Sequence, residues 1–335
     1  MSEWELGDDP QGWPTVSVVM PIRNEAAHLE RAVTAVLAQG YPRSFDVCLA
    51  VGPSNDHTSR MARELAEADN RVVVVENPAG VTPAGLNIAI RATSGEVIVR
   101  VDGHAELSPG YIRRAVETLS RTGAVNVGGV QHAVGETRFE EAVAVAMSSW
   151  IGTGGSKFHV GGTEGPVDTV YLGVFRRAAL ESAGHFDERL VRNQDYELNI
   201  RLRGAGGIIW FDPELSVFYR PRGSLRSLAR QYFEYGCWKA EVTRMHPRAL
   251  KLRQIAPVVI TSSIGAGTIL GLRQRRFLIG PISYCIGVAI AAGRIRRVGE
   301  STVQLAIIAA TMHLAWGTGF LSAWICRSQC AGDHS

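Results

Sequence analysis

The sequence of 335 residues predicts an α/β domain with a mostly parallel sheet flanked by helices, followed by a region of apolar helices. Between residues 15 and 101, short runs of β-branched residues alternate with stretches of helical periodicity. Beyond residue 247, charged residues nearly vanish from three long segments. Strand–helix repetition with nearly all-apolar strands is typical of a parallel sheet buried on both faces, which binds ligands at the carboxyl ends of its strands.

Four apolar runs near the start of the chain are the predicted parallel strands. They are Val16–Met20, Asp46–Val51, Arg71–Val75 and Glu96–Val101. The first helical connection is expected to have Asn24 as its cap and Gly40 as its stop. Its apolar residues repeat at helical spacing, at Leu29, Ala32, Val33, Val36 and Leu37. Helices are also predicted from Thr58 to Asp69 and from Pro83 to Gly95.

After residue 101 the pattern is less regular. A helix is predicted from Pro109 to Arg121, and an apolar strand from Ala124 to Gln131. The Gly-rich stretch Gly152–Thr163 predicts a mobile loop, either over a site or simply at the surface, because so many glycines cost too much entropy inside a regular element.

Charge and cysteine content exclude several classes of protein. The formal net charge of +3 is too mild for a nucleic-acid partner, and the basic clusters border apolar segments, which favours a membrane surface. The five cysteines are an odd number without CxxC spacing, so they predict core thiols instead of a disulfide framework or a structural zinc site. Residues 1–14 are polar and acidic and lack an apolar run, so we expect a flexible terminus and a cytoplasmic domain.

Three apolar segments near the end of the chain approach the length of about 20 residues that crosses a bilayer. They are Gln254–Leu272, Phe277–Gly293 and Val303–Cys326. The basic linkers Arg273–Arg276 and Arg294–Arg297 separate them. Three crossings from a cytoplasmic domain would place the first linker outside, against the positive-inside tendency, so one segment is expected to be re-entrant or interfacial. A soluble helical hairpin is the alternative.

Polar residues follow the first two predicted strands. After the first, Asn24 and Glu25 can border a nucleotide or serve only as a helix cap and a first-turn acid. After the second, Ser54 and Asp56 can hydrogen-bond a base or a ribose, while Thr58 is expected to cap the next helix. Capping alone explains most of this second segment.

The fourth predicted strand ends in Asp102, followed two residues later by His104. In an extended segment these side chains point the same way and can hold a divalent cation, for which a carboxylate with an imidazole suits Mn²⁺ somewhat better than Mg²⁺. The alternative is a turn with an ordinary hydrogen-bonded Asp. Further along, Asp195 begins a helix that includes Glu197, so it is either a capping residue or a general base for an acceptor hydroxyl.

An aromatic run, Gln231–Lys239, lies just before the apolar region. Tyr, Phe and Trp at that boundary suit a membrane-interface belt. Gln231 and Trp238 can equally hydrogen-bond and stack on a sugar.

Taken in this order, these segments resemble the family 2 glycosyltransferases of the GT-A fold, and most closely the membrane-attached subgroup typified by succinoglycan-type exopolysaccharide glycosyltransferases. The motifs that carry the resemblance are Val16–Glu25, Val101–His104, Phe175–Arg177, Gly184–Glu188, Asn193–Asp195 and Gln231–Trp238. The resemblance covers about residues 16–238, and His313–Phe320 in the apolar region is similar too.

The resemblance implies a GT-A domain over residues 15–247, a membrane region of about three helices over 248–327 and a tail over 328–335. It implies that the donor, a nucleotide diphosphate-sugar, is bordered by Pro21, Arg23, Glu25, Ser54, Asp56 and Asp102. It places the acceptor near Asn193, Gln194, Gln231 and Trp238, and a cation, Mn²⁺ or Mg²⁺, on Asp102 and His104.

The implied chemistry is a single inverting displacement in which Asp195 takes the proton of a lipid-linked or polysaccharide acceptor. The expected place is the cytoplasmic face of the inner (plasma) membrane, with a multi-pass or partly re-entrant anchor and one sugar added per acceptor. A UDP-sugar is the expected donor, although the family's Asp-Asp-Gly-Ser turn, whose acid commonly contacts uracil, is Val51–Ser54 here. His104 replaces the usual Asp of the metal motif, which can alter metal preference.

Other functions remain as alternatives. A membrane scaffold that binds a sugar nucleotide or lipid without turnover fits the same features. A sugar-phosphate nucleotidyltransferase is expected to carry a Gly-rich pyrophosphate loop after its first strand, and this chain has no such glycines there. The absence of a GxGxxG motif after the first strand argues against a dinucleotide oxidoreductase.

Overall fold

The computed structural model describes residue 4 and residues 6–326, and the chain divides into two compact units. The sheet unit comprises the residues up to His132 together with Gly161–Tyr219. The helical unit comprises Ala133–Val160 and the residues from Arg220 onward. The predicted domain boundary at residue 247 stays a prediction, although this division assigns the aromatic run before it to the helical unit.

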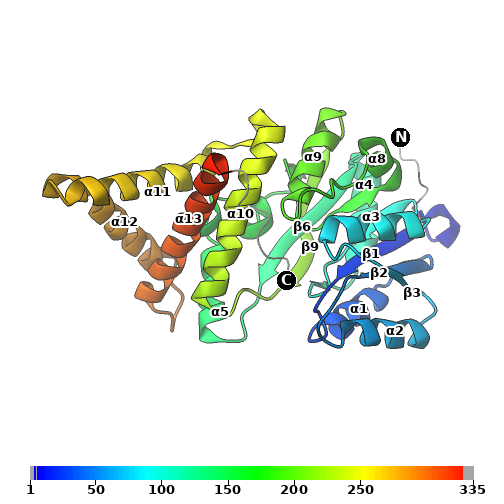
Figure 1. The fold of residues 1–335 in the computed structure, drawn as a ribbon. Coiled ribbons are helices and arrows are strands. Elements are labelled where there is room, and N and C mark those ends of the chain that lie inside the picture. The colour runs from blue at the N-terminus through cyan, green and yellow to red at the C-terminus, as the bar shows by residue number, and fades with distance from the viewer. Residues whose placement is uncertain (1–3, 5, 327–335) are drawn as a thin grey trace. The chain divides into compact units, whose positions relative to one another are not determined.

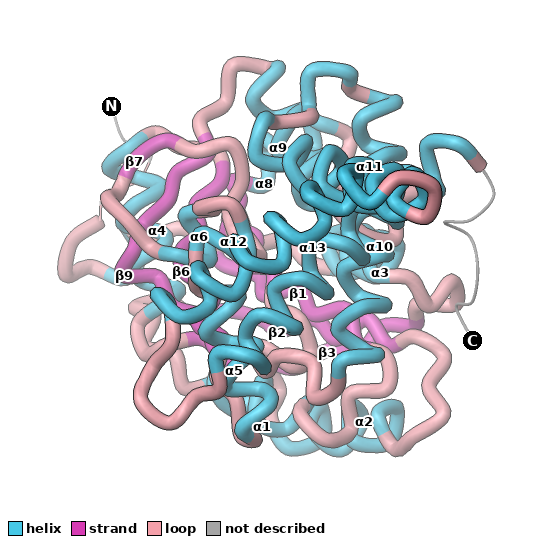
Figure 2. The backbone as a smooth tube through the Cα atoms, turned by 90° about the vertical axis from the view of Figure 1, so that its left-hand side faces the viewer, coloured by secondary structure: helices cyan, strands magenta, loops and turns pink. Residues whose placement is uncertain are grey.

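A mixed sheet forms the centre of the sheet unit (Figure 1; strands magenta in Figure 2). Its strand order is β3-β2-β1-β4-β8-β6-β9-β5, and β7 pairs with β9. The strands are β1 (Val16–Ile22), β2 (Phe45–Val51), β3 (Val72–Glu76), β4 (Val97–Arg100), β5 (Glu106–Leu107), β6 (Asn126–Ala133), β7 (Gly165–Pro166), β8 (Val174–Arg176) and β9 (Ile209–Tyr219).

The first four strands pair in parallel, as the sequence predicts. The pairs β4–β8, β6–β8, β5–β9 and β7–β9 are antiparallel. Four of these strands, β5, β7, β8 and β9, were not predicted. The sheet therefore joins a parallel half, which presents several strand ends at one edge, to an antiparallel half.

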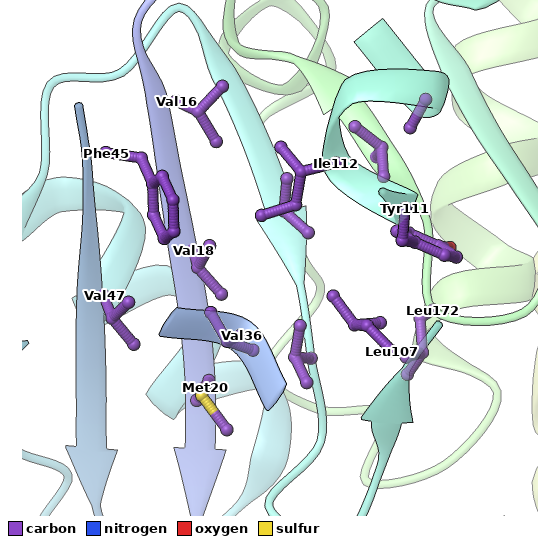
Figure 3. Close-up of a cluster of buried hydrophobic side chains, with 14 of the residues drawn as sticks. Val16, Val18, Met20, Val36, Phe45, Val47, Leu107, Tyr111, Ile112 and Leu172 are labelled. Atoms are coloured by element: carbon purple, nitrogen blue, oxygen red, sulfur yellow. The ribbon is translucent and has the colours of Figure 1, made fainter. Parts of the chain in front are cut away.

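Helices cover both faces of this sheet. They are α1 (Leu29–Leu37), α2 (Thr58–Ala68), α3 (Thr82–Ala92), α4 (Tyr111–Thr122), α8 (Arg177–Ala183) and α9 (Gln194–Gly204), and a short 3₁₀ turn (Pro10–Gly12) precedes β1. Along β1 the side chains alternate between two cores, because successive strand residues point to opposite faces. Val18 and Met20 pack with Val36 of α1 (Figure 3). Val19 packs with Leu86 of α3 on the other face.

Two predicted helix caps are wrong. Asn24 does not cap α1, which begins at Leu29 after His28, and Asn24 instead has a left-handed backbone with φ 55°. Thr58 is the first residue of α2 and not its cap, because its hydroxyl donates to Asp56 and accepts from the backbone N–H of Glu25. Both residues instead make hydrogen bonds that connect the loops between the strands and the helices.

Part of the N-terminal segment joins the core of the sheet unit. Trp4 and Trp13 are buried, the Arg176 guanidinium lies over the Trp4 ring, and Trp13 Nε1 donates to the carbonyl of Gly7 at 2.8 Å.

The helical unit contains no strand among its described residues apart from the last residue of β6. Its α-helices are α5 (Arg138–Met147), α6 (Trp150–Thr153), α7 (Lys157–Val160), α10 (Leu225–Met245), α11 (Leu252–Gly271), α12 (Ile279–Ile295) and α13 (Thr302–Ile325). 3₁₀ turns cover Pro247–Ala249 and Arg275–Leu278. As predicted, three helical segments are long and apolar enough to cross a membrane: Leu252–Gly271, Arg275–Ile295 and Thr302–Ile325.

The prediction of a loop throughout Gly152–Thr163 is wrong, because this stretch holds the end of α6 and all of α7. Ser149 caps α6 by accepting from the backbone N–H of Gly152. A Cβ at Gly152 would lie 2.1 Å from the carbonyl oxygen of Ala146, so glycine is required there for α6 to fold back on α5. Gly154, with φ 61°, ends α6.

The cysteine prediction holds in part. None of the four cysteines in the described part of the chain forms a disulfide. Cys48 and Cys237 are buried thiols as predicted, but Cys285 on α12 and Cys326, directly after α13, are exposed. Cys330 lies outside the described residues.

A buried carboxylate connects β9 to α4. The carboxylate of Asp212 is fully buried and accepts hydrogen bonds from Arg114 Nε at 2.8 Å and from the Thr118 hydroxyl at 2.7 Å. Burial by itself raises the pKa of Asp212, but the hydrogen bonds from Arg114 and Thr118 outweigh it and hold that pKa below its ordinary value. The folded state therefore favours the ionised form.

We expect Asp212→Asn to lower the free energy of unfolding by about 1–3 kcal/mol at pH 7, since a charged hydrogen-bond acceptor is lost from the core. Because the folded pKa is depressed, this contribution is complete above the unfolded pKa and is lost as the pH falls through the folded value. Thermal unfolding in detergent, followed from pH 7 to pH 3, should show the difference between the two proteins shrinking with acid. Glu64→Gln, in an exposed ion pair with Arg60, is the control. A constant difference across this range would refute the assignment.

Candidate functional site

The loops that follow β1, β2 and β4 meet at one edge of the sheet. These strands are neighbours and run in parallel, with β1 between the other two. At this edge Ile22, the last residue of β1, lies beside Val51, the last residue of β2. The polar residues that follow the strands are therefore gathered where ligands of parallel sheets bind.

The loops after β1 and β2 are connected by reciprocal hydrogen bonds. The backbone N–H of Asn24 donates to the Ser54 hydroxyl at 3.1 Å, and that of Asn55 donates to Asn24 Oδ1 at 2.8 Å. The backbone N–H of Ala26 donates to Asp56 Oδ2 at 3.1 Å. The side chains of Ser54 and Asp56, predicted to contact a nucleotide, thus have partners within the protein.

Thr58 completes this connection from a fully buried position. Its hydroxyl accepts from the backbone N–H of Glu25 at 2.8 Å and donates to Asp56 Oδ1 at 2.6 Å. The hydrogen bond from the Thr58 side chain is the main cause that lowers the pKa of Asp56 below its ordinary value. This edge therefore carries a fixed negative charge.

Arg23 and Pro21 lie next to the loop after β2 and to β2 itself, respectively. Arg23 Nε donates to the carbonyl of Pro53 at 3.1 Å. Pro21 lies within β1, beside Ala50 of β2. Gly80, with φ 64°, passes close to Pro53, where an added Cβ would lie 3.1 Å from the proline ring. The loop after β3 therefore packs against the loop after β2.

The chain after β4 forms a turn and not the extended segment that the sequence analysis assumed. β4 ends at Arg100, and the backbone N–H of Ala105 donates to the carbonyl of Asp102 at 2.9 Å. Strand alternation therefore does not orient Asp102 and His104. His104 Nδ1 lies 2.8 Å from Glu25 Oε1, so the turn after β4 is connected to the loop after β1.

Glycine is required in this turn. A Cβ at Gly103 would lie 2.9 Å from Cγ of Glu25 and 3.0 Å from a methyl carbon of Ile22. Neither atom is the free end of a flexible side chain, so a larger residue would push the turn away from the loop after β1. Gly103 thus allows the close approach that pairs His104 with Glu25.

Arg100 is the electrostatic centre of the site. Its side chain is 6% exposed, and Nη2 and Nε donate to Asp102 Oδ1 at 3.0 and 3.2 Å. Burial by itself lowers the pKa of Arg100, but the charges of Asp102 and Asp195 more than compensate and raise it above its ordinary value. The guanidinium is therefore close enough to both carboxylates to interact with each.

The start of α9 brings Asp195 into this arrangement. Asn193 precedes the helix with a left-handed backbone, φ 59°, a conformation that Asn tolerates better than most residues. Asp195 lies in the first turn, where its Oδ1 accepts from the backbone N–H of Tyr196 at 2.8 Å. Both predicted acids, Asp102 and Asp195, therefore interact electrostatically with one buried cation, Arg100.

Comparisons with known proteins show the family of the chain. Residues 17–184 match glycosyl transferase family 2. Over 308 residues the chain is 32% identical to the succinoglycan biosynthesis protein ExoA of Rhizobium meliloti, covering 90% of this chain and 93% of that protein. The chain belongs to glycosyl transferase family 2. It is also 26% identical to the glycosyltransferase AglE of Haloferax volcanii, over 94% of this chain and 98% of that protein.

A solved structure shares the fold of this family 2 glycosyltransferase. The mannosyltransferase PcManGT from Pyrobaculum calidifontis, in complex with GDP-Man and Mn²⁺, superposes with a TM-score of 0.61 at 20% identity. The match covers 93% of this chain and 90% of the mannosyltransferase. The GT-A fold expected from the sequence resemblance is thereby confirmed.

Sequence reasoning missed three residues of this candidate site. Arg100 was visible as a charge at the end of an apolar strand, but its pairing was not predicted. The Tyr219 ring lies 5.9 Å from that of His104. Burial, followed by the Asp102 charge, raises the pKa of Tyr171 well above its ordinary value, so its phenol stays protonated beside that carboxylate. Tyr171 comes from the loop before β8, where the sequence has no motif to mark it.

The predicted acceptor residues belong to both units. Asn193 and Gln194 open α9 in the sheet unit, where Gln194 is buried. Gln231 and Trp238 lie on α10 of the helical unit, where Gln231 is buried and its Nε2 donates to the Tyr235 hydroxyl at 3.2 Å. Contact of these four residues with an acceptor stays a prediction.

The residues around the β4 turn fit a divalent cation that a bound diphosphate helps to hold. Within the described residues, no group of three or more His, Cys, Asp or Glu side chains is placed to bind a metal. Mg²⁺ in nucleotide enzymes is typically held by one or two carboxylates together with substrate phosphates, so a smaller protein ligand set suffices. The Glu25–His104 pair is the kind of contact that orients metal-bound imidazoles.

We expect Thr58→Val to weaken nucleotide binding, because this buried hydroxyl cannot touch a ligand but connects the loops that border one. Loss of its hydrogen bonds should cost about 0.5–1.5 kcal/mol, or roughly 2- to 13-fold in Kd, measured by calorimetry with UDP and GDP. Thr34→Val, at an exposed position of α1, is the matched control. Equal affinity of both variants and wild type would show that the connected loops do not position the nucleotide.

Proposed function

We propose that this family 2 glycosyltransferase moves one sugar from a nucleotide diphosphate-sugar to a lipid-linked or polysaccharide acceptor, with inversion at the anomeric carbon. The observation that carries this proposal is the placement of Asp102 and Asp195 around the buried Arg100 at the strand ends. Two acids that interact with one cation can serve two roles, one at the leaving diphosphate and one at the acceptor.

The proposed step is a single displacement. The acceptor hydroxyl oxygen attacks the anomeric carbon from the face opposite the nucleotide, and the bond from that carbon to the phosphate oxygen breaks with its electron pair leaving on the diphosphate. Asp195 takes the acceptor proton as general base. The guanidinium of Arg100 interacts electrostatically with both Asp195 and Asp102.

Asp102 and His104 would hold the divalent cation in this proposal. When bound, such an ion neutralises the negative charge that develops on the departing nucleoside diphosphate. The Glu25 carboxylate orients His104 through the 2.8 Å contact with Nδ1. A ligand set with one imidazole favours Mn²⁺ over Mg²⁺, which prefers oxygen.

The donor and the acceptor are proposed from the relatives. A solved neighbour binds GDP-Man with Mn²⁺, which supports a nucleotide-sugar donor, and we retain a UDP-sugar as the first candidate. A relative that acts in succinoglycan biosynthesis supports an exopolysaccharide or its lipid-linked precursor as the acceptor. The apolar helices support transfer at a membrane, for which we propose the cytoplasmic face of the inner membrane.

Asp195→Asn should lower kcat by roughly 10²–10⁴-fold, because an amide cannot take the acceptor proton, while donor binding stays within about twofold of wild type. The assay is transfer from a panel of radiolabelled nucleotide sugars to membrane extracts in the presence of Mn²⁺. Glu181→Gln, an exposed carboxylate in α8, should retain full activity. Equal rates for Asp195→Asn and wild type would remove Asp195 as the base.

The same assay distinguishes the enzyme from a sugar-nucleotide-binding scaffold. A scaffold would bind a nucleotide in calorimetry and show neither sugar transfer nor nucleotide release with any donor of the panel.

Removal of divalent cations with EDTA should abolish transfer, and Mn²⁺ should restore it at lower concentration than Mg²⁺. His104→Asn should raise the Mn²⁺ concentration for half-maximal activity about 10- to 100-fold, as expected when one metal ligand is weakened. His28→Asn, at the residue before α1, is the control. Full activity in EDTA would contradict the proposed cation, without affecting the assignment of Asp195.

A further inference from the structure

The loop before β8 carries a strained backbone beside the candidate site. Leu172 has a left-handed backbone with φ 58°, a conformation that is rare for a bulky residue. Gly173 follows with φ 103°, and a Cβ there would lie 2.5 Å from the ring of Phe175. Such strain persists only where the surrounding structure fixes the backbone, and it is concentrated at ligand-binding and catalytic sites. The strain therefore indicates that the conformation of this loop has a role in binding.

Burial of the Leu172 side chain explains what holds the strained backbone in place. This side chain is 2% exposed and belongs to the core cluster that contains Leu107 and Tyr111 (Figure 3). The backbone of the loop is also confined by β6, because a Cβ at Gly128 would lie 2.9 Å from the carbonyl oxygen of Tyr171. Leu172 is thus fixed in the core, whereas the preceding residue, Tyr171, is only half-buried.

The register of the sheet places Tyr171 beside Asp102. β4 and β8 are antiparallel, and the backbone N–H of Arg100 donates to the carbonyl of Gly173 at 3.1 Å. Because the strands run in opposite directions, two residues further along β4 and two residues back along β8 lead to Asp102 and Tyr171. The electrostatic interaction of the phenol with the Asp102 carboxylate agrees with this placement.

The strand order decides which part of a donor this residue meets. β2, β1, β4 and β8 are successive neighbours, and the loop before β8 lies at the carboxyl edge of β4 because these two strands are antiparallel. In the proposed function, the loops after β1 and β2 border the nucleotide and Asp102 lies at the diphosphate. The sugar is attached to the far phosphate of that diphosphate. The next loop along this edge, which carries Tyr171, is therefore level with the sugar.

The side chains around the Tyr171 phenol are complementary to a sugar. Of the charged groups that act on the phenol, Asp102 has the largest effect, and Gln131, buried in β6, lies beside it. Tyr219 is also close to the phenol, and its ring lies 5.9 Å from that of His104. A sugar has hydroxyls for hydrogen bonds and apolar C–H groups for aromatic rings, so it suits this mixture of polar groups and rings.

We propose that Tyr171 binds the sugar of the donor through a hydrogen bond between its phenol hydroxyl and one sugar hydroxyl, and that it thereby contributes to the choice of sugar. This inference rests on the proposed function, because it takes the donor to be a nucleotide diphosphate-sugar. A site that hydrogen-bonds a substrate hydroxyl rejects an analogue that lacks this hydroxyl, because the protein group is then left without its partner.

Calorimetry with wild type and Tyr171→Phe tests this contact, because the substitution removes only the hydroxyl. The probes are the nucleotide sugars of the transfer panel, among them UDP-glucose and GDP-mannose, with UDP and GDP as the nucleotides without sugar, all with Mn²⁺ and without acceptor. For the nucleotide sugar that wild type binds most tightly, Tyr171→Phe should raise the Kd about 2- to 13-fold, the effect of one hydrogen bond. The Kd values of UDP and GDP should be the same for both proteins.

Tyr111→Phe is the matched control, since it removes a buried hydroxyl that has no hydrogen-bond partner in the described part of the chain. It should bind every probe as wild type does. Equal Kd values of wild type and Tyr171→Phe for every nucleotide sugar would overturn the proposal. An equal loss of affinity for UDP or GDP would also overturn it, because the hydroxyl would then act at the diphosphate.

Deoxygenated donors test the same contact in the unmodified protein. Analogues of the most tightly bound nucleotide sugar, each lacking one sugar hydroxyl, are compared with the parent compound. One analogue should bind wild type about 2- to 13-fold more weakly, and this loss should disappear in Tyr171→Phe. Losses that are the same in both proteins for every analogue, or no loss in wild type, would contradict the contact. Absence of sugar transfer in the separate assay, with these binding differences intact, would count against the transferase proposal alone.

Discussion

The buried guanidinium of Arg100 is the constraint around which the candidate functional edge of the sheet is arranged. A cation with 6% exposure is unstable in a protein interior unless anions compensate it, and Asp102 and Asp195 do so here. Asp102 belongs to the turn after β4, and Asp195 to the first turn of α9. One charge therefore brings together two segments that are nearly a hundred residues apart in the sequence.

Further contacts connect the turn that carries Asp102 to the loops after β1 and β2. The turn after β4 can approach the loop after β1 because residue 103 is glycine, and His104 then meets Glu25. The buried hydroxyl of Thr58 connects that loop to the loop after β2. Each link joins the ends of neighbouring parallel strands, so the parallel half of the sheet supplies the rigid base that a nucleotide-binding edge needs.

How much of the fold and of the candidate site could be predicted from the sequence depended on the length and the pattern of each element. The strands β1 to β4 were predicted because their apolar runs alternate with helical periods. β8 has three residues, and β9 contains Asp212, Pro213 and Glu214, so neither shows a strand pattern. Asp102, His104 and Asp195 were predicted from their motifs, whereas the pairing with Arg100 and the approach of Tyr171 depend on tertiary packing. Likewise, three apolar segments predicted three similar helices, whereas the greater burial of α13 within the protein depends on tertiary packing.

The anomeric configuration of the product tests the central claim most directly. The claim is that Asp195 acts as base in a single displacement at the strand-end site, which requires inversion. With the nucleotide sugar that the donor panel identifies, the new glycosidic linkage would be assigned by NMR and compared with the linkage in the donor. The account predicts the opposite configuration, β from an α-linked donor. A product that retains the donor configuration would contradict it.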